Sequence, residues 1–157
     1  MLSDIVVDTN VMMHAQNPME RRFKSSLTFL NALLKSATQI CVDVGFDINP
    51  ISNQSLIAGE YFKHLRFGSA SYAVLTNLAR ANRIKELNKN LPDRERKVIN
   101  QCVRKSRDKT FVVITRNSEE KILVSHDFKD FQNEKRAHLR RELGIAILEA
   151  SECHSKL

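Results

Sequence analysis

Two aspartates stand at positions where an α/β protein gathers groups for chemistry. Asp8 directly follows the β-branched run 4–7, and Asp127 stands two residues beyond the apolar run 121–125. Because open α/β sheets collect their ligand sites at the carboxyl ends of the strands, we expect both carboxylates to face one crevice. The alternative is that each acid caps the helix that follows it.

Glu60 interrupts the apolar face of a predicted helix. The segment 52–67 has helical spacing, and the apolar residues Ile57 and Tyr61 stand on either side of Glu60. An unpaired carboxylate is costly to bury, so a group in this position is protonated, paired with a base or bound to a cation. Glu60 is therefore a candidate ligand, and His64, one turn later, is the alternative partner.

Asp108 has the position of an acid at the start of a helix. Phe111, Val112 and Thr115 follow it by three, four and seven residues, which places these three on one helical face. The carboxylate is thereby held in a defined place at the end of a buried surface. The candidate acids are thus Asp8, Glu60, Asp108 and Asp127.

Carboxylates that converge in one cleft imply a metal ion, because their mutual repulsion raises their pKa values unless a dication neutralises them. Oxygen ligands without paired cysteines or histidines favour one or two Mg²⁺ or Mn²⁺ ions over zinc. The three cysteines, Cys41, Cys102 and Cys153, are too widely separated for a paired zinc site. Such a metal activates water and stabilises charge on a phosphoryl group, so we expect phosphodiester hydrolysis.

The elements that must position these acids alternate between strand and helix. The expected strands cover 4–8, 39–43, 121–125 and 145–148, and the expected helices cover 19–36, 52–67, 70–82, 93–105 and 132–143, with another from Asp108. Alternation of this kind implies parallel strands joined by right-handed crossovers. We predict a three-layer α/β/α fold with a central parallel sheet of four or five strands. One domain is expected over 1–150, followed by a short tail over 151–157.

The composition is that of a basic globular protein. The net charge of +7 and the pI near 9.5 point to a polyanionic partner such as a nucleic acid. No apolar run approaches the roughly 18 residues of a membrane span, and no basic segment precedes an apolar signal stretch. We therefore expect a cytoplasmic protein without membrane contact.

Together these segments resemble the PIN-domain nuclease family over about residues 4–148. The resemblance depends on VVDTNV, GEYF, DKTFVVIT and ILVSHDFKDF, which contain Asp8, Glu60, Asp108 and Asp127 in the order of the family's acids. It implies that these four acids bind Mg²⁺ or Mn²⁺ and are catalytic. It assigns a supporting role to Asn10, Ser125 and Asp130. It also implies an endonuclease that acts on single-stranded RNA in preference to DNA.

Three other acids compete for places in this set. Asp93 and Glu95 also precede an apolar pair, but Glu95 stands 32 residues before Asp127, which is too far for the single helix expected between the last two ligands. Both acids suit the start of a helix, where negative charge complements the helix dipole. Asp43 lies at the start of a loop and is interpreted as a turn residue. Each of the three stays an alternative member of the site.

Basic residues gather immediately before Asp108. The candidates for substrate contact are Arg104, Lys105, Arg107 and Lys109, together with His126. His126 is expected to be exposed, because it lies in a polar segment between two site residues. The alternative is that the basic residues form a solvated helix face balanced by nearby acids.

The resemblance is compatible with several cellular roles. The chain fits a toxin with an antitoxin partner, a processing nuclease, or a defence component, and it fits a homodimer. The main functional alternative is a PIN-like nucleic-acid-binding or scaffold module without catalytic activity. A nucleotide-binding domain is disfavoured, because the chain has no GxxxxGK[ST] loop for phosphates.

Overall fold

A computed structural model describes residues 1–157 and contains one five-stranded parallel sheet. The strands are β1 (Asp4–Val7), β2 (Gln39–Asp43), β3 (Ile84–Leu87), β4 (Ile122–Val124) and β5 (Ala146–Leu148). Their order in the sheet is β3-β2-β1-β4-β5, and every neighbouring pair is parallel. The chain therefore builds the sheet outward from β1 in one direction, and then returns to add β4 and β5 on the other side.

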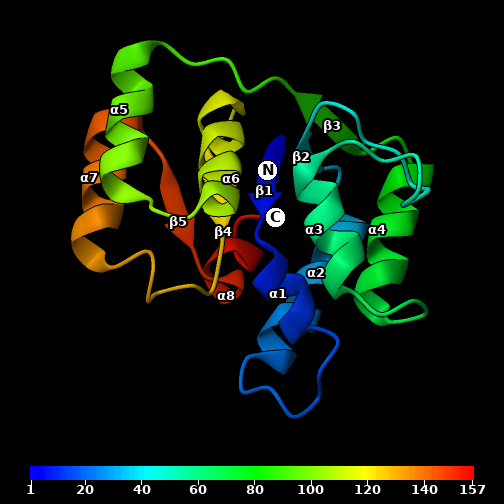
Figure 1. The fold of residues 1–157 in the computed structure, drawn as a ribbon. Coiled ribbons are helices and arrows are strands. Elements are labelled where there is room, and N and C mark those ends of the chain that lie inside the picture. Colours follow the sequence, from blue (N-terminus) through cyan, green and yellow to red (C-terminus); the bar gives the residue numbers. More distant parts are fainter.

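Eight helices connect and flank the strands (Figure 1). They are α1 (Thr9–His14), α2 (Phe23–Lys35), α3 (Leu56–His64), α4 (Ala70–Arg80), α5 (Asp93–Cys102), α6 (Ser106–Asn117), α7 (Asn133–Leu143) and α8 (Ala150–His154). None of them is long and apolar enough to cross a membrane.

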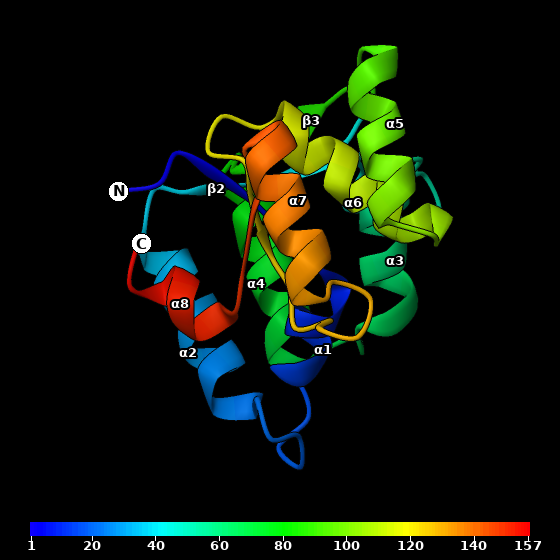
Figure 2. The ribbon, with the colours of Figure 1, turned by 90° about the vertical axis from the view of Figure 1, so that its left-hand side faces the viewer.

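The helices form a layer on each face of the sheet. The helix α2 packs against α4 and α8 on one face, while α5 packs against α6 and α7 on the other (Figures 1 and 2). The central strand β1 is buried along its whole length, as expected for a parallel strand covered on both faces. The prediction of a three-layer α/β/α fold with a parallel sheet is confirmed.

Two elements differ from the sequence-based expectation. The strand β3 was not predicted, because its sequence IKEL carries two charges and lacks an apolar run; it forms at the sheet edge, where its residues are only partly buried. Residues 150–154, which were expected to lie at the domain end and in a tail, form the helix α8. Ala150 and Cys153 on this helix are fully buried against α2.

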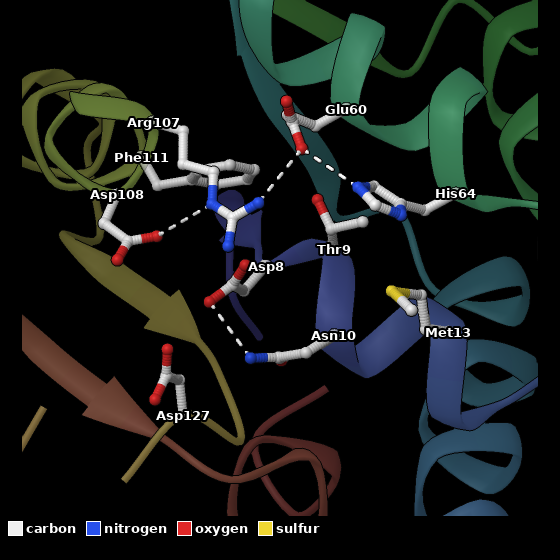
Figure 3. Close-up of a pocket in the computed structure, with 10 residues that line it drawn as sticks. All are labelled: Asp8, Thr9, Asn10, Met13, Glu60, His64, Arg107, Asp108, Phe111 and Asp127. Atoms are coloured by element: carbon white, nitrogen blue, oxygen red, sulfur yellow. Dashed lines mark hydrogen bonds and ion pairs between the residues drawn. The ribbon is translucent and has the colours of Figure 1, made fainter. Parts of the chain in front are cut away.

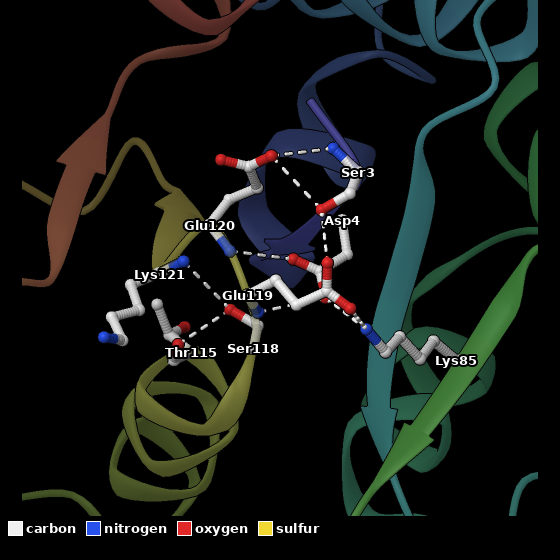
Figure 4. A network of polar contacts seen from close by, with 8 residues as sticks. All are labelled: Ser3, Asp4, Lys85, Thr115, Ser118, Glu119, Glu120 and Lys121. Atoms are coloured by element: carbon white, nitrogen blue, oxygen red, sulfur yellow. Dashed lines mark hydrogen bonds and ion pairs between the residues drawn. The ribbon is translucent and has the colours of Figure 1, made fainter. Parts of the chain in front are cut away.

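The amino end of β1 is fixed by a charged network, shown in Figure 4. Asp4 is fully buried, and its carboxylate accepts hydrogen bonds from the backbone N–H groups of Glu119 (3.2 Å) and Glu120 (3.1 Å). Lys85 Nζ lies 2.8 Å from Asp4 Oδ2, and thereby connects β3 with β1. Although burial alone would raise the pKa of Asp4, these hydrogen bonds hold it below its usual value.

A pair of substitutions in α8 tests whether this helix belongs to the domain. Cys153→Asp places a carboxylate in a fully buried position, so we expect it to lower the free energy of unfolding by at least about 2 kcal/mol. Ser151→Asp adds the same group at an exposed position of the same helix and serves as the control. Urea unfolding followed by circular dichroism measures both. Equal stability of the two variants would mean that α8 does not pack as described.

Candidate metal centre

Asp8 lies at the carboxyl end of β1, beside the end of β4. The two strands pair through Val7 and Val124, and the Asp8 N–H donates to the Val124 carbonyl oxygen (2.8 Å). The Ser125 hydroxyl donates to Asp8 Oδ2 (2.7 Å), and the Asn10 side-chain amide is 3.3 Å from the same oxygen. Although Asp8 precedes α1, its side chain makes no capping hydrogen bond, so the helix-cap interpretation does not account for it. The sheet reverses its strand order at β1 and β4, which is where α/β sheets bind ligands.

Asp108 approaches the same place from α6. It is the third residue of this helix, and Phe111, Val112 and Thr115 are buried on the face that packs against the sheet. The predicted helix start is therefore confirmed. Only 8% of Asp108 is exposed, and its carboxylate lines the same cavity as Asp8.

Asp127 and Asp130 lie in the loop after β4. The Asp127 N–H donates to the Ser125 hydroxyl (3.1 Å), and the Asp130 N–H donates to Asp127 Oδ1 (3.0 Å), so the loop holds both acids in place. One carboxylate oxygen from each of Asp108, Asp127 and Asp130 lies within 4.8 Å of the others. This spacing can hold a single cation. Asp130, which the sequence suggested only as a supporting residue, thus belongs to the tightest group of acids.

Glu60 faces the cavity from α3, as Figure 3 shows. The hydroxyl of its neighbour Tyr61 donates to the Val7 carbonyl oxygen and ties α3 to β1. Glu60 Oε2 lies 3.3 Å from His64 Nε2 and 3.9 Å from a guanidinium nitrogen of Arg107. Both interpretations of Glu60 therefore hold in part: it pairs with His64, and it also lines the cavity with the other three acids.

The four predicted acids line one cavity of about 230 Å³. Burial, together with the charges of Asp108 and Asp127, raises the pKa of Asp8 to about 6, although the Ser125 hydrogen bond acts in the opposite direction. Burial also raises the pKa of Asp108, followed in effect by the charges of Asp130 and Asp127. The site therefore concentrates negative charge that its own hydrogen bonds do not neutralise.

The donor set fits a hard divalent cation. Its ligands are carboxylate oxygens, and all three cysteines are buried outside the cavity lining. The hydroxyl oxygen of Thr9, next to Asp8 in the cavity wall, is buried without a hydrogen-bond partner. Most buried polar groups in folded proteins have a hydrogen-bond partner, so an unpartnered hydroxyl in a cavity wall is available to a ligand. The group of carboxylates could therefore hold a metal ion.

The competing acids have other partners. The buried carboxylate of Asp43 accepts hydrogen bonds from the Ser55 hydroxyl (2.7 Å) and the N–H groups of Leu56 (2.8 Å) and Ile57 (2.9 Å). It therefore fixes the start of α3, the helix that carries Glu60, and does not line the cavity.

Asp93 and Glu95 also lie outside the cavity, in the first turn of α5. Glu95 Oε1 lies 2.5 Å from Arg116 Nη2, and Asp93 is exposed. The preference for Asp108 over these two acids therefore agrees with the geometry.

The expectation that His126 is exposed is wrong. Only 7% of His126 is exposed, and its ring stacks on His14 with the centroids 5.1 Å apart. Its Nε2 accepts a hydrogen bond from the Ala150 N–H (3.2 Å), and burial, followed by His14, lowers its pKa to about 4. The residue stays neutral at ordinary pH and connects the loop of Asp127 to α1 and α8. Sequence reasoning could not see this, because both partners lie far away in the chain.

The four basic residues next to Asp108 in the sequence have different environments. Arg107 lines the cavity, and Lys105 Nζ lies 2.7 Å from Asp130 Oδ2. Arg104 is exposed, and Lys109 is partly buried in α6 without lining the cavity. Two of the four basic residues are therefore placed beside the acids.

Comparison of this chain with protein-family models, with curated proteins and with solved structures finds no match. The case for a function therefore depends on the geometry of the acidic cavity and on the chemistry of its side chains.

Substitution of Asp43 separates its capping role from metal binding. Asp43→Ala leaves two backbone N–H groups and a buried hydroxyl without their acceptor, so we expect a loss of about 2 kcal/mol or more in the free energy of unfolding. Isothermal titration with Mn²⁺ at a temperature where the variant is folded should give the wild-type affinity. Loss of Mn²⁺ binding by the folded variant would instead place Asp43 in the metal site.

The raised pKa of Asp8 predicts a pH-dependent cost to stability. In the metal-free protein the folded-state pKa of about 6 exceeds the ordinary value of 3.8, so the folded state holds the proton more tightly and stability falls as the pH rises from about 4 to 6. Asp8→Asn removes this charge and keeps an acceptor for Ser125. In EDTA at pH 7.5 it should stabilise the protein by about 3 kcal/mol, and the gain should vanish at pH 4. Urea unfolding at both pH values measures this, and an equal gain at both would exclude ionisation of Asp8 as the cause.

Proposed function

We propose that this chain is a Mg²⁺- or Mn²⁺-dependent nuclease with a PIN-like fold that hydrolyses phosphodiester bonds in single-stranded RNA. The observation that carries the proposal is the convergence of Asp108, Asp127 and Asp130 within 4.8 Å, in a site where Asp108 and Asp127 share a cavity with the buried Asp8. Bringing these carboxylates together on folding costs free energy, because each ionised carboxylate repels the others and raises their pKa values. A divalent cation offsets this cost, which accounts for their position.

The residues divide into ligands and supports. Asp8, Asp108 and Asp127 would hold the metal, with Asp130 completing the group and Glu60 facing it across the cavity. When bound, a metal of this class activates water and stabilises negative charge on the phosphoryl group. The hydroxyl of Ser125 and the amide of Asn10 bind Asp8 and fix the direction of its carboxylate.

Nucleic acid as the substrate is supported by charge. The chain has a net charge of +7, and Arg107, with 54% of its side chain exposed, lies at the acidic cavity. Positive charge around a negative, metal-binding cavity suits a phosphodiester, which must approach the metal while its neighbouring phosphates are neutralised. The preference for RNA over DNA comes from the resemblance of VVDTNV and ILVSHDFKDF to PIN-domain nucleases.

The proposal is tested by incubating the protein with end-labelled single-stranded RNA and DNA in Mn²⁺ or in EDTA. We expect the RNA to be cleaved in Mn²⁺ and to stay intact in EDTA. Asp127→Asn should lower the cleavage rate at least about 100-fold, because it removes a negative ligand at nearly constant size. Metal-independent binding without cleavage would contradict the nuclease and favour a binding or scaffold module.

A matched pair of variants tests the third ligand. Asp108→Asn should lose cleavage, whereas Glu95→Gln changes an acid that pairs with Arg116 outside the cavity and should keep it. The reverse pattern would place Glu95 at the reacting phosphate. Circular dichroism of both variants confirms that any loss is not due to unfolding.

A further inference from the structure

Arg107 lies between acids on the two helices that flank the cavity. Its Nη1 is 3.9 Å from Glu60 Oε2 on α3, and its Nε is 3.9 Å from Asp108 Oδ1 on α6. In Figure 3 the guanidinium group lies above Asp8, between the carboxylates of Glu60 and Asp108. Among the basic residues that precede Asp108 it is the one that lines the cavity. The metal-free site therefore already contains a cation, and the chain itself supplies it.

These contacts hold Arg107 by charge and not by hydrogen bonds. At 3.9 Å the nitrogen–oxygen distances exceed hydrogen-bond length, and the guanidinium donates no hydrogen bond within the protein. Arg83 shows the contrast, because its guanidinium donates to the carbonyl oxygens of Leu33 (2.6 Å) and Leu34 (3.1 Å) and is fixed at the end of α2. All five N–H donors of Arg107 stay available to a ligand.

We infer that Arg107 is a displaceable counter-cation: it offsets part of the negative charge of the cavity in the metal-free protein, and the incoming metal releases it to bind a phosphate of the nucleic-acid strand. The inference depends on the proposed function, because it assumes that the cavity binds a divalent metal. A dication among the same carboxylates repels the guanidinium and takes over its role as counter-charge. The side chain is more than half exposed, so it can turn outward without breaking the packing of α6.

The released group suits a phosphodiester. A guanidinium matches the oxygens of a phosphate with two parallel hydrogen bonds, and such charge-assisted bonds are stronger than neutral ones. Lys105 is less suited, because its ammonium group is 2.7 Å from Asp130 Oδ2 and is already paired. Arg107 would thus bind nucleic acid strongly only after the metal has entered, which couples the two binding events.

Titration with Mn²⁺ tests the competition. Arg107→Gln removes the counter-cation, so the variant should bind Mn²⁺ roughly twofold to tenfold more tightly than the wild type, as expected for the loss of two exposed ion pairs. Arg104→Gln removes the same charge three residues earlier, at an exposed position outside the cavity, and should keep the wild-type affinity. Isothermal titration calorimetry measures all three proteins.

Binding of an oligonucleotide tests the release. Fluorescence anisotropy with a labelled single-stranded RNA is measured in EDTA and in Ca²⁺, and a gel checks that the RNA stays intact. Ca²⁺ should tighten RNA binding by the wild type and by Arg104→Gln, and Arg107→Gln should lose most of this gain although it binds metal more tightly. The opposite changes in metal and RNA affinity are the signature of a displaceable counter-cation.

The outcomes separate this inference from the proposed function. If the wild type binds Mn²⁺ and cleaves RNA while Arg107→Gln resembles Arg104→Gln in both titrations, the counter-cation role is overturned and the nuclease stands. Weaker Mn²⁺ binding by Arg107→Gln would also overturn it. If the wild type binds no Mn²⁺, both the inference and the proposed function fail.

Discussion

Repulsion among carboxylates at the ends of β1 and β4 is the constraint on which this structure depends. The strand register places Asp8 beside Ser125. Hydrogen bonds within the loop that follows Ser125 hold Asp127 and Asp130 in place. The pairing of β1 with β4 therefore holds Asp8 close to the loop that carries Asp127 and Asp130. Burial and the proximity of these acids raise the pKa values of Asp8 and Asp108.

The molecule reduces this repulsion with its own basic side chains. Lys105 pairs with Asp130 on one side of the group, while Arg107 and His64 lie beside Glu60 on the other. Each of these pairs is at least partly exposed, so each contributes little to stability in water. The inner acids, Asp8 and Asp108, are the least exposed of the group, and burial together with the neighbouring acids raises the pKa of both. The charge balance is thus left incomplete at the inner acids, and Thr9, whose hydroxyl has no hydrogen-bond partner, lines the same cavity.

The sequence predicted the place of those site residues whose location follows from their position along one strand or helix. Asp8 and Asp127 could be placed together because parallel strands end at one edge, and Asp108 because its apolar partners follow at helical spacing. Asp130, His126 and β3 could not be placed in this way. Asp130 joins the site through a loop bond to Asp127, His126 is buried by α1 and α8, and β3 forms because an existing strand offers it a free edge. These features depend on contacts between distant segments, which hydrophobic periodicity does not record.

The two ends of β1 differ in how their buried aspartates are compensated. Asp4 and Asp8 are both buried aspartates at the ends of the same central strand. Asp4 has a lysine at 2.8 Å and two backbone N–H donors, and its pKa is lowered. Asp8 has a hydroxyl and an amide as partners but is surrounded by further acids, and its pKa is raised to about 6. Both aspartates are buried, so burial alone does not tell a candidate metal ligand from an acid that is paired within the protein. Lys85 forms an ion pair with Asp4, whereas no lysine or arginine forms one with Asp8, and this difference suits Asp8 to a cation supplied from outside the chain.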